Sequence, residues 1–188
     1  MKFKRYTLIS LVLITISLET VEAQEKGTFR VNGGLTYGSK FGVEEDFSDS
    51  KGALGFNLGA EYLVGEDIGL ALGYSQYAKQ NATFSEDGFT IDAEVWVSTI
   101  DFDLRYYFLS DAVQVYGLLG YSNVKVTAEI SLFGFTEKDS ETDNAFNLGM
   151  GAMFPLSEKV AINTQAKWHK MSEEGHFVAN LGIMFQLN

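Results

Sequence analysis

The sequence predicts an all-β fold, an eight-stranded antiparallel up-and-down transmembrane β-barrel. Apolar residues recur at every second position in eight segments, which is the period of a β-strand. The positions between them are mostly glycine, alanine, serine, threonine and asparagine. The connections alternate between short and long, so one end of the sheet carries turns and the other carries loops, as in transmembrane barrels.

Composition limits the possible functions. With 188 residues, of which 46% are apolar, the chain has room for one ordered domain. It has no cysteine, which excludes disulfides, thiolate metal sites and a cysteine nucleophile. A net charge of −11 argues against nucleic-acid binding, because phosphate contacts need clustered lysine and arginine. Only two histidines are present and no ligands cluster around them, so we expect no cofactor and no metal site.

The N-terminus has the layout of a cleaved signal peptide. A basic cap precedes an uncharged, mostly apolar run over 6–18, and small residues follow at the spacing that a signal peptidase reads, ending at Ala23. The run is too short for a spanning helix, which needs about 20 apolar residues. We expect residues 1–23 to be removed and residues 24–188 to form the barrel domain.

The strand period places the eight strands and their connections. The strands cover residues 29–37, 54–62, 68–75, 96–106, 113–122, 146–154, 160–169 and 177–186. The bulky face of each is represented, in chain order, by Val31, Phe56, Leu70, Phe102, Leu119, Leu148, Ile162 and Ile183. Tight turns are expected at 65–67, 109–112 and 156–159, and long acidic loops at 38–52, 79–94, 124–144 and 170–176.

Residue size and charge decide which face of the sheet meets lipid. The apolar face is bulky and carries no charged residue. An eight-stranded barrel has an interior only wide enough for side chains to fill it, and it has no room for so many Phe, Leu, Trp and Tyr residues. No predicted helix is available to cover the bulky face. We therefore assign that face to lipid and the small polar face to the lumen.

Aromatic residues on the lipid face are spaced as two girdles. Pairs lie eight residues apart on three strands, which is about 26 Å along a strand and ~20 Å after a tilt of roughly 40°. That is near the ~25 Å apolar band which aromatic girdles flank. The pairs are Phe29 and Tyr37, Phe146 and Phe154, and Phe177 and Phe185.

Charged residues on the lumen face balance in sign. Three acids and three bases fall there, as expected of paired buried charges: Arg30, Glu61, Asp101, Asp103, Arg105 and Lys167. Arg30 and Glu61 lie near the turn end of neighbouring strands, so we expect this pair to meet. Asp101 and Asp103 lie about 6.6 Å apart on one face, within range for acid–base chemistry, but we interpret them as partners of the lumen cations.

The signal segment, the glycine-studded meander and the C-terminal strand resemble small outer-membrane β-barrel proteins of the OmpA/OmpX-like kind. The resemblance covers about residues 27–188 and implies a Gram-negative outer-membrane location, contact with outer-membrane lipids and insertion by the outer-membrane assembly machinery. That machinery reads a glycine, a later apolar residue and a terminal aromatic or apolar residue. Gly182, Phe185 and Leu187 match this assembly signal, whereas Leu181 stands where a polar residue is usual.

Two classes of function remain open. One is a structural or surface-interaction barrel with a charge-paired lumen, whose acidic extracellular loops meet an unidentified surface ligand. The other is a narrow, porin-like pore for ions or small solutes. We favour the first, because eight strands leave little open bore. A barrel-embedded lipid-modifying enzyme is a distant third, since the spacing of His169 and Ser172 sends their side chains to opposite faces of a strand, so we expect no enzyme.

Overall fold

The computed structural model describes residues 26–41, 52–86, 89–109, 113–132, 135–171 and 175–187. The predicted signal peptide and the bond after Ala23 lie outside these residues. Within these residues the chain forms nine strands, β1 Phe29–Gly38, β2 Ala53–Leu63, β3 Ile68–Tyr77, β4 Gln80–Glu86, β5 Phe89–Leu109, β6 Gln114–Leu132, β7 Phe135–Pro155, β8 Val160–Lys170 and β9 Gly175–Gln186. No helix among the described residues is long and apolar enough to cross a membrane.

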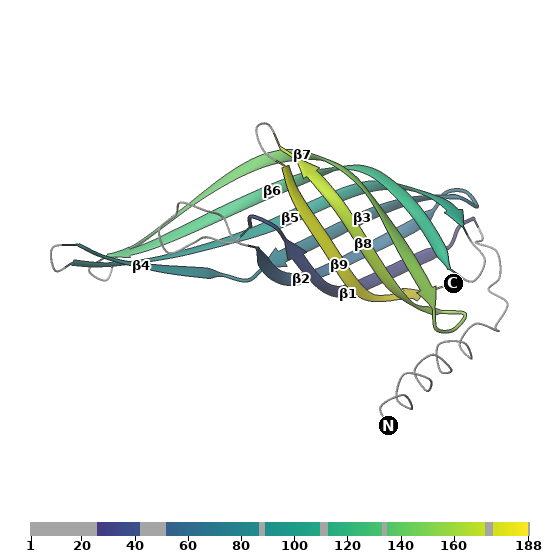
Figure 1. Ribbon diagram of the computed structural model, residues 1–188, viewed down its shortest axis with the longest axis horizontal. Coiled ribbons are helices and arrows are strands. Elements are labelled where there is room, and N and C mark those ends of the chain that lie inside the picture. The colour runs from purple at the N-terminus through teal and green to yellow at the C-terminus, as the bar shows by residue number, and fades with distance from the viewer. Residues whose placement is uncertain are drawn as a thin grey trace, which may run out of the picture.

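Eight of these strands close into a barrel (Figure 1). They run in the order β3-β2-β1-β9-β8-β7-β6-β5, and a further pairing of β3 with β5 joins the two ends of the sheet. All the pairings are antiparallel, which confirms the predicted up-and-down barrel. At the closure between the first and last strands Gly34 lies opposite Gly182, and a Cβ on either would meet the backbone of the other strand.

The two ends of the barrel differ. At one end short connections at 64–67 and 156–159 are closed by backbone hydrogen bonds of 2.9 Å from Val64 to Ile68 and 2.8 Å from Leu156 to Val160. The chain after β9 ends at this same end, where the Leu187 N–H donates to the Phe29 carbonyl at 2.9 Å. We call it the turn end and the opposite end the loop end.

Two connections predicted as loops are strands. The segment 79–94 forms β4 and the first part of β5, and the segment 124–144 continues β6 and β7 without a register shift. The physical reason is visible in the sequence, because the strand period does not stop at the barrel rim. Val124, Val126, Ala128 and Ile130 keep every second position apolar. The acidic residues between 137 and 143 therefore lie on a strand and not on a loop tip.

Beyond the barrel these extensions make a four-stranded sheet, which we call the blade. It comprises residues 80–86 of β4, 89–95 of β5, 125–132 of β6 and 135–144 of β7. It projects from the loop end, far from the C-terminus (Figure 1).

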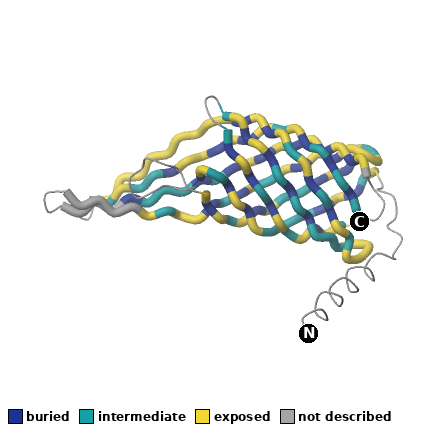
Figure 2. Tube along the Cα trace, in the orientation of Figure 1, coloured by how far each residue is buried: buried dark blue, intermediate teal, exposed yellow. Residues whose placement is uncertain are grey.

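Burial alternates along the barrel strands as the sequence predicts (Figure 2). On β7, Phe146 and Leu148 are 69% and 66% exposed, whereas Asn147 between them is fully buried. The phase of β6, which is ambiguous in sequence, is also as predicted, with Leu119 exposed and Ser122 buried. The bulky apolar side chains therefore cover the outside of the barrel and the polar ones fill its lumen.

The lumen also holds bulky apolar side chains. The prediction from residue size, which assigns such side chains to the lipid face alone, is therefore too broad. They form two layers, one at each end of the barrel, with the charged residues between them. The loop-side layer consists of Phe41, Ala53, Tyr77, Val97, Val124, Ala145 and Val178. The turn-side layer consists of Leu63, Tyr107, Tyr116, Leu118, Met153 and Met184. An eight-stranded barrel accommodates them because they stack along its axis and do not share one level.

Lumen glycines make room for the larger lumen side chains. Gly120 lies directly opposite Asp103, and Gly149 lies opposite Lys167. A Cβ at Gly120 would collide with the Asp103 carboxylate, and a Cβ at Gly149 would collide with the backbone of β8. The charged side chains occupy the space that these glycines leave empty.

Candidate functional site: the filled lumen and the blade

The six charged residues predicted for the lumen all project into it. Each is at most 4% exposed, and they come from β1, β2, β5 and β8. They divide into two groups along the barrel axis. The step from Asp103 to Arg105 on β5 joins the groups.

The turn-side group contains two cations that share one carboxylate. Glu61 Oε2 lies 3.7 Å from Arg30 Nη1 and 3.4 Å from Arg105 Nη1. Glu61 Oε1 accepts a 2.6 Å hydrogen bond from the Tyr107 hydroxyl. The Arg105 guanidinium also lies over the Tyr116 ring, 4.9 Å from its centroid. The expected pair of Arg30 and Glu61 does meet, within a triad of net charge +1.

The middle group reverses this arrangement, since two carboxylates share one cation. Lys167 Nζ lies 2.7 Å from Asp101 Oδ2 and 3.3 Å from Asp103 Oδ2. Asp103 also accepts a 3.0 Å hydrogen bond from the Asn147 amide, and Asp101 accepts one from the Ser122 hydroxyl. The group has a net charge of −1, which cancels the excess of the turn-side group.

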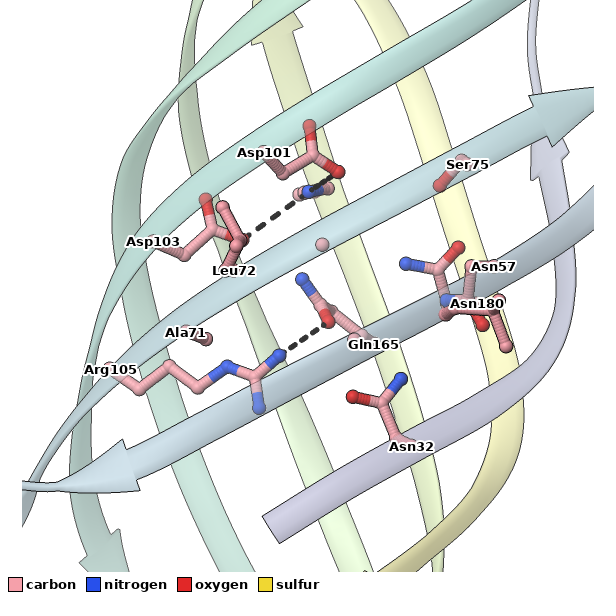
Figure 3. Close-up of a pocket in the computed structure, with 14 residues that line it drawn as sticks. Asn32, Asn57, Ala71, Leu72, Ser75, Asp101, Asp103, Arg105, Gln165 and Asn180 are labelled. Atoms are coloured by element: carbon pink, nitrogen blue, oxygen red, sulfur yellow. Dashed lines mark hydrogen bonds and ion pairs between the residues drawn. The ribbon is translucent and has the colours of Figure 1, made fainter. Parts of the chain in front are cut away.

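Contacts in the middle of the lumen cross from one wall to the other (Figure 3). β5 and β8 are not neighbours in the barrel, yet Lys167 on β8 reaches both aspartates on β5. Arg105 Nη2 on β5 likewise donates to Gln165 Oε1 on β8 at 3.3 Å. The cavity beside these contacts is about 20 Å³, which is room for about one water molecule. Its polar walls include Asn32, Asn57 and Asn180 (Figure 3).

A lysine–tryptophan cluster lies at the base of the blade. Lys79 Nζ lies 4.5 Å and Lys138 Nζ 4.9 Å from the centroid of the Trp96 ring. Lys79 also donates a 2.5 Å hydrogen bond to Glu94. This hydrogen bond raises the pKa of Lys79 above its ordinary value. The cluster links the β3–β4 connection, β5 and β7 on one face of the sheet.

The other residues singled out in the sequence lie at identifiable positions. Gly182 and Phe185 lie on β9 and Leu187 directly follows it. Their role as an assembly signal stays a prediction. The six aromatic residues assigned to girdles lie on the outside and are between 39% and 69% exposed: Phe29, Tyr37, Phe146, Phe154, Phe177 and Phe185. His169 is fully buried in the lumen, and Ser172 lies outside the described residues.

Sequence reasoning missed the aromatic residues of the lumen and the free edge of the blade. The strand period gives a signal for the lumen aromatic residues. Tyr77, Tyr107 and Tyr116 each lie two residues beyond a lumen position that was assigned correctly, so extending the alternation by one step finds them.

A closed antiparallel barrel with an apolar exterior and a charged, filled interior defines an integral membrane β-barrel protein. The sequence model of the outer membrane protein beta-barrel domain matches residues 8–185, and the chain belongs to this family. Its location is therefore the outer membrane. Barrels of this membrane carry short turns on the periplasmic side and longer connections on the extracellular side. No curated protein sequence matches the chain.

Solved structures share the fold. Ail, the attachment invasion locus protein of Yersinia pestis, is 23% identical with a TM-score of 0.59, over 87% of this chain and 100% of that one. The N-terminal barrel domain of Pseudomonas aeruginosa OprF is 17% identical with a TM-score of 0.60, over 87% and 100%. OprG of the same organism is 12% identical with a TM-score of 0.65, over 89% and 99%. At these identities the likeness concerns the barrel and does not extend to a ligand.

Proposed function

We propose that this protein is a closed outer-membrane barrel that anchors the blade at the cell surface for interaction with a partner. The observation that carries the proposal is the filling of the lumen. Lys167 and Arg105 bridge strands on opposite walls, and an apolar layer lies on each side of the charged residues. A solute would have to displace all three levels to pass. This role is structural and requires no catalysis.

The blade presents surface that is available to a partner. Residues 135–144 of β7 are exposed without interruption, and Phe135 near the tip is 82% exposed. Exposed apolar side chains on the blade, such as Phe135, Ile130 and Val126, favour contact with another molecule over a purely solubilising role. The Lys79–Trp96–Lys138 cluster fixes the base of the blade to the barrel rim.

The blade of this chain differs in charge from a surface suited to a polyanion. Ail has been crystallised with the heparin analogue sucrose octasulfate. Here Glu137, Asp139, Glu141 and Asp143 line one face of β7, and these carboxylates would repel sulfates. We therefore propose that the partner of this face is not a sulfated ligand.

A narrow pore for ions or small solutes is the second candidate, favoured by the polar cavity of about 20 Å³ beside Asp101. A liposome-swelling assay tests whether small solutes pass through the barrel and so distinguishes this pore from the closed barrel. Protein refolded into liposomes should exclude arabinose and glycine, as protein-free liposomes do. Swelling at rates that rise with protein content would contradict the closed barrel.

Shortening the blade tests whether the anchor and the blade are separate parts. Residues 127–140 would be replaced by a two-residue Asn-Gly turn between Val126 and Glu141, which lie opposite each other in the register. The barrel should keep its midpoint of unfolding in urea and its exclusion of solutes. Loss of barrel folding would show that the blade is part of the anchor.

A further inference from the structure

β7 has a free edge within the blade. β8 pairs with β7 only from Phe146 onward, where Phe146 lies opposite Lys170. Among the described residues no strand pairs with residues 135–145 on that side. A free strand edge presents a row of backbone N–H and C=O groups that can pair with an added strand.

The hydrogen-bond pattern shows which residues form this edge. The register of β7 against β6 has no shift from one end to the other, so backbone groups of alternate residues point to opposite sides. The Ala152 carbonyl accepts a hydrogen bond from the Thr164 hydroxyl of β8, so even-numbered residues of β7 point to the β8 side. In the blade that side is the free edge, formed by Thr136, Lys138, Ser140, Thr142 and Asn144.

Two of these edge donors are covered by carboxylates of the same strand. The Ser140 N–H donates to Asp139 Oδ1 at 2.8 Å, and the Asn144 N–H donates to Asp143 Oδ1 at 2.7 Å. A strand that adds here must take these two N–H groups from the aspartates. A neutral or acidic strand would have to break two charge-assisted hydrogen bonds and would leave these exposed carboxylates to water alone.

The same carboxylates belong to a row with the period of a strand. Glu137, Asp139, Glu141 and Asp143 occupy one face of β7 at intervals of about 6.7 Å. They lie directly opposite the apolar row of β6, from Ile130 to Val124. A strand added at the edge would place its own alternate residues on this face, about 5 Å from the carboxylates.

We propose that the free edge of β7 accepts an extended cationic segment of a partner protein as an added strand and refuses neutral and acidic segments. Lysine or arginine at alternate positions would pair with the carboxylates and release the Ser140 and Asn144 N–H groups to the carbonyls of the incoming strand. Asp139 and Asp143 thus close the edge against unspecific pairing and also select the partner. This inference rests on the proposed function of the blade and names the class of partner.

Two peptides of equal composition test the proposal on the full mature chain in nanodiscs. One is a twelve-residue peptide of alternating lysine and threonine, and the other has six lysines followed by six threonines. Fluorescence anisotropy at 50 mM salt should give a Kd at least tenfold lower for the alternating peptide. Its binding should slow amide hydrogen exchange at Lys138, Ser140 and Thr142 but not at the odd-numbered residues. Equal affinities, or binding without this alternate protection, would overturn the proposal.

Paired variants distinguish the effect of the two hydrogen bonds that cover the edge N–H groups from the effect of the negative charge on that face of β7. Asp139→Ala with Asp143→Ala removes both covering carboxylates, and Glu137→Gln with Glu141→Gln removes the same charge from the same face. Both pairs should weaken binding of the alternating cationic peptide at least tenfold. Only the aspartate pair should gain binding of a neutral threonine–glutamine peptide, and the same gain in both pairs would refute selection by the aspartates. If no peptide binds, this inference is refuted but the closed barrel is not. Only passage of solutes or ions through the lumen would contradict the closed barrel.

Discussion

The Arg105 guanidinium lies closer to Glu61 than the Arg30 guanidinium does, although Arg30 is directly opposite Glu61 in the β1–β2 register. The Nη1–Oε2 distances are 3.4 Å and 3.7 Å. Arg105 is on β5, and β3 lies between β5 and β2. Glu61 is therefore the centre of a triad that ties three strands together across the curvature of the barrel.

Loss of the Glu61 charge should be costly. Glu61→Gln leaves two buried guanidinium groups uncompensated and should lower the free energy of unfolding by about 3–5 kcal/mol. Adding Arg30→Met should recover only part of this loss, because Arg105 stays unpaired. Urea titration in detergent, followed by tryptophan fluorescence, measures both effects. If the losses from Glu61→Gln and Arg30→Met simply add, the two residues are not coupled.

Two lumen glycines flanking neighbouring aspartates should respond differently to alanine. Gly120→Ala places a Cβ against the Asp103 carboxylate and the Phe102 carbonyl and should cost about 1–3 kcal/mol of unfolding free energy. Gly73→Ala is the matched control, since its Cβ would lie 3.6 Å from Asp101, at ordinary contact distance. Comparable losses from the two variants in the same urea titration would show that the lumen glycines are not required for space.

Arginine on the lipid face should destabilise the inserted barrel. Leu148→Arg or Ile183→Arg should cost about 2–4 kcal/mol, because both side chains are exposed on the outside of the barrel, between the two aromatic girdle positions of their strands. Thr142→Arg, on the exposed blade, should have little effect. The readout is the free energy of unfolding from lipid vesicles. Unchanged stability in both lipid-face variants would place these side chains outside the membrane.

Processing should leave a chain that begins at Gln24. Mass spectrometry of the intact protein extracted from outer membranes should give the mass of residues 24–188. A mature protein that retains residues 6–18 would refute the assignment of a cleaved signal peptide.

The fold and the composition of the lumen could be predicted because both depend on local alternation. A period of two assigns Glu61, Asp101 and Lys167 to the same face of the sheet. Because the bore of an eight-stranded barrel is narrow, side chains on that face must lie close to one another. The partners within the lumen could not be predicted. Whether Glu61 meets Arg30, Arg105 or both depends on the stagger of β2 against β5, which a single strand's pattern does not encode.

The blade was missed for a different reason. Acidic residues such as Glu137, Asp139 and Glu141 suggest a solvated loop, because charge is more frequent there than on strands. Here the alternation of Val124, Val126 and Ala128 on the neighbouring strand outweighs that preference and keeps the segment paired. Strand period is thus a better guide than charge at the rim of the barrel.

Ion conductance tests the central claim, that the lumen is closed. Protein refolded from the mature chain would be inserted into planar lipid bilayers, with insertion verified by protease protection of the barrel. We expect no conductance steps above the leak of the bare bilayer in 1 M KCl, because Lys167, Arg105 and the two apolar layers fill the bore. Stable, uniform steps from the unmodified protein would contradict a closed lumen and establish a narrow ion pore instead.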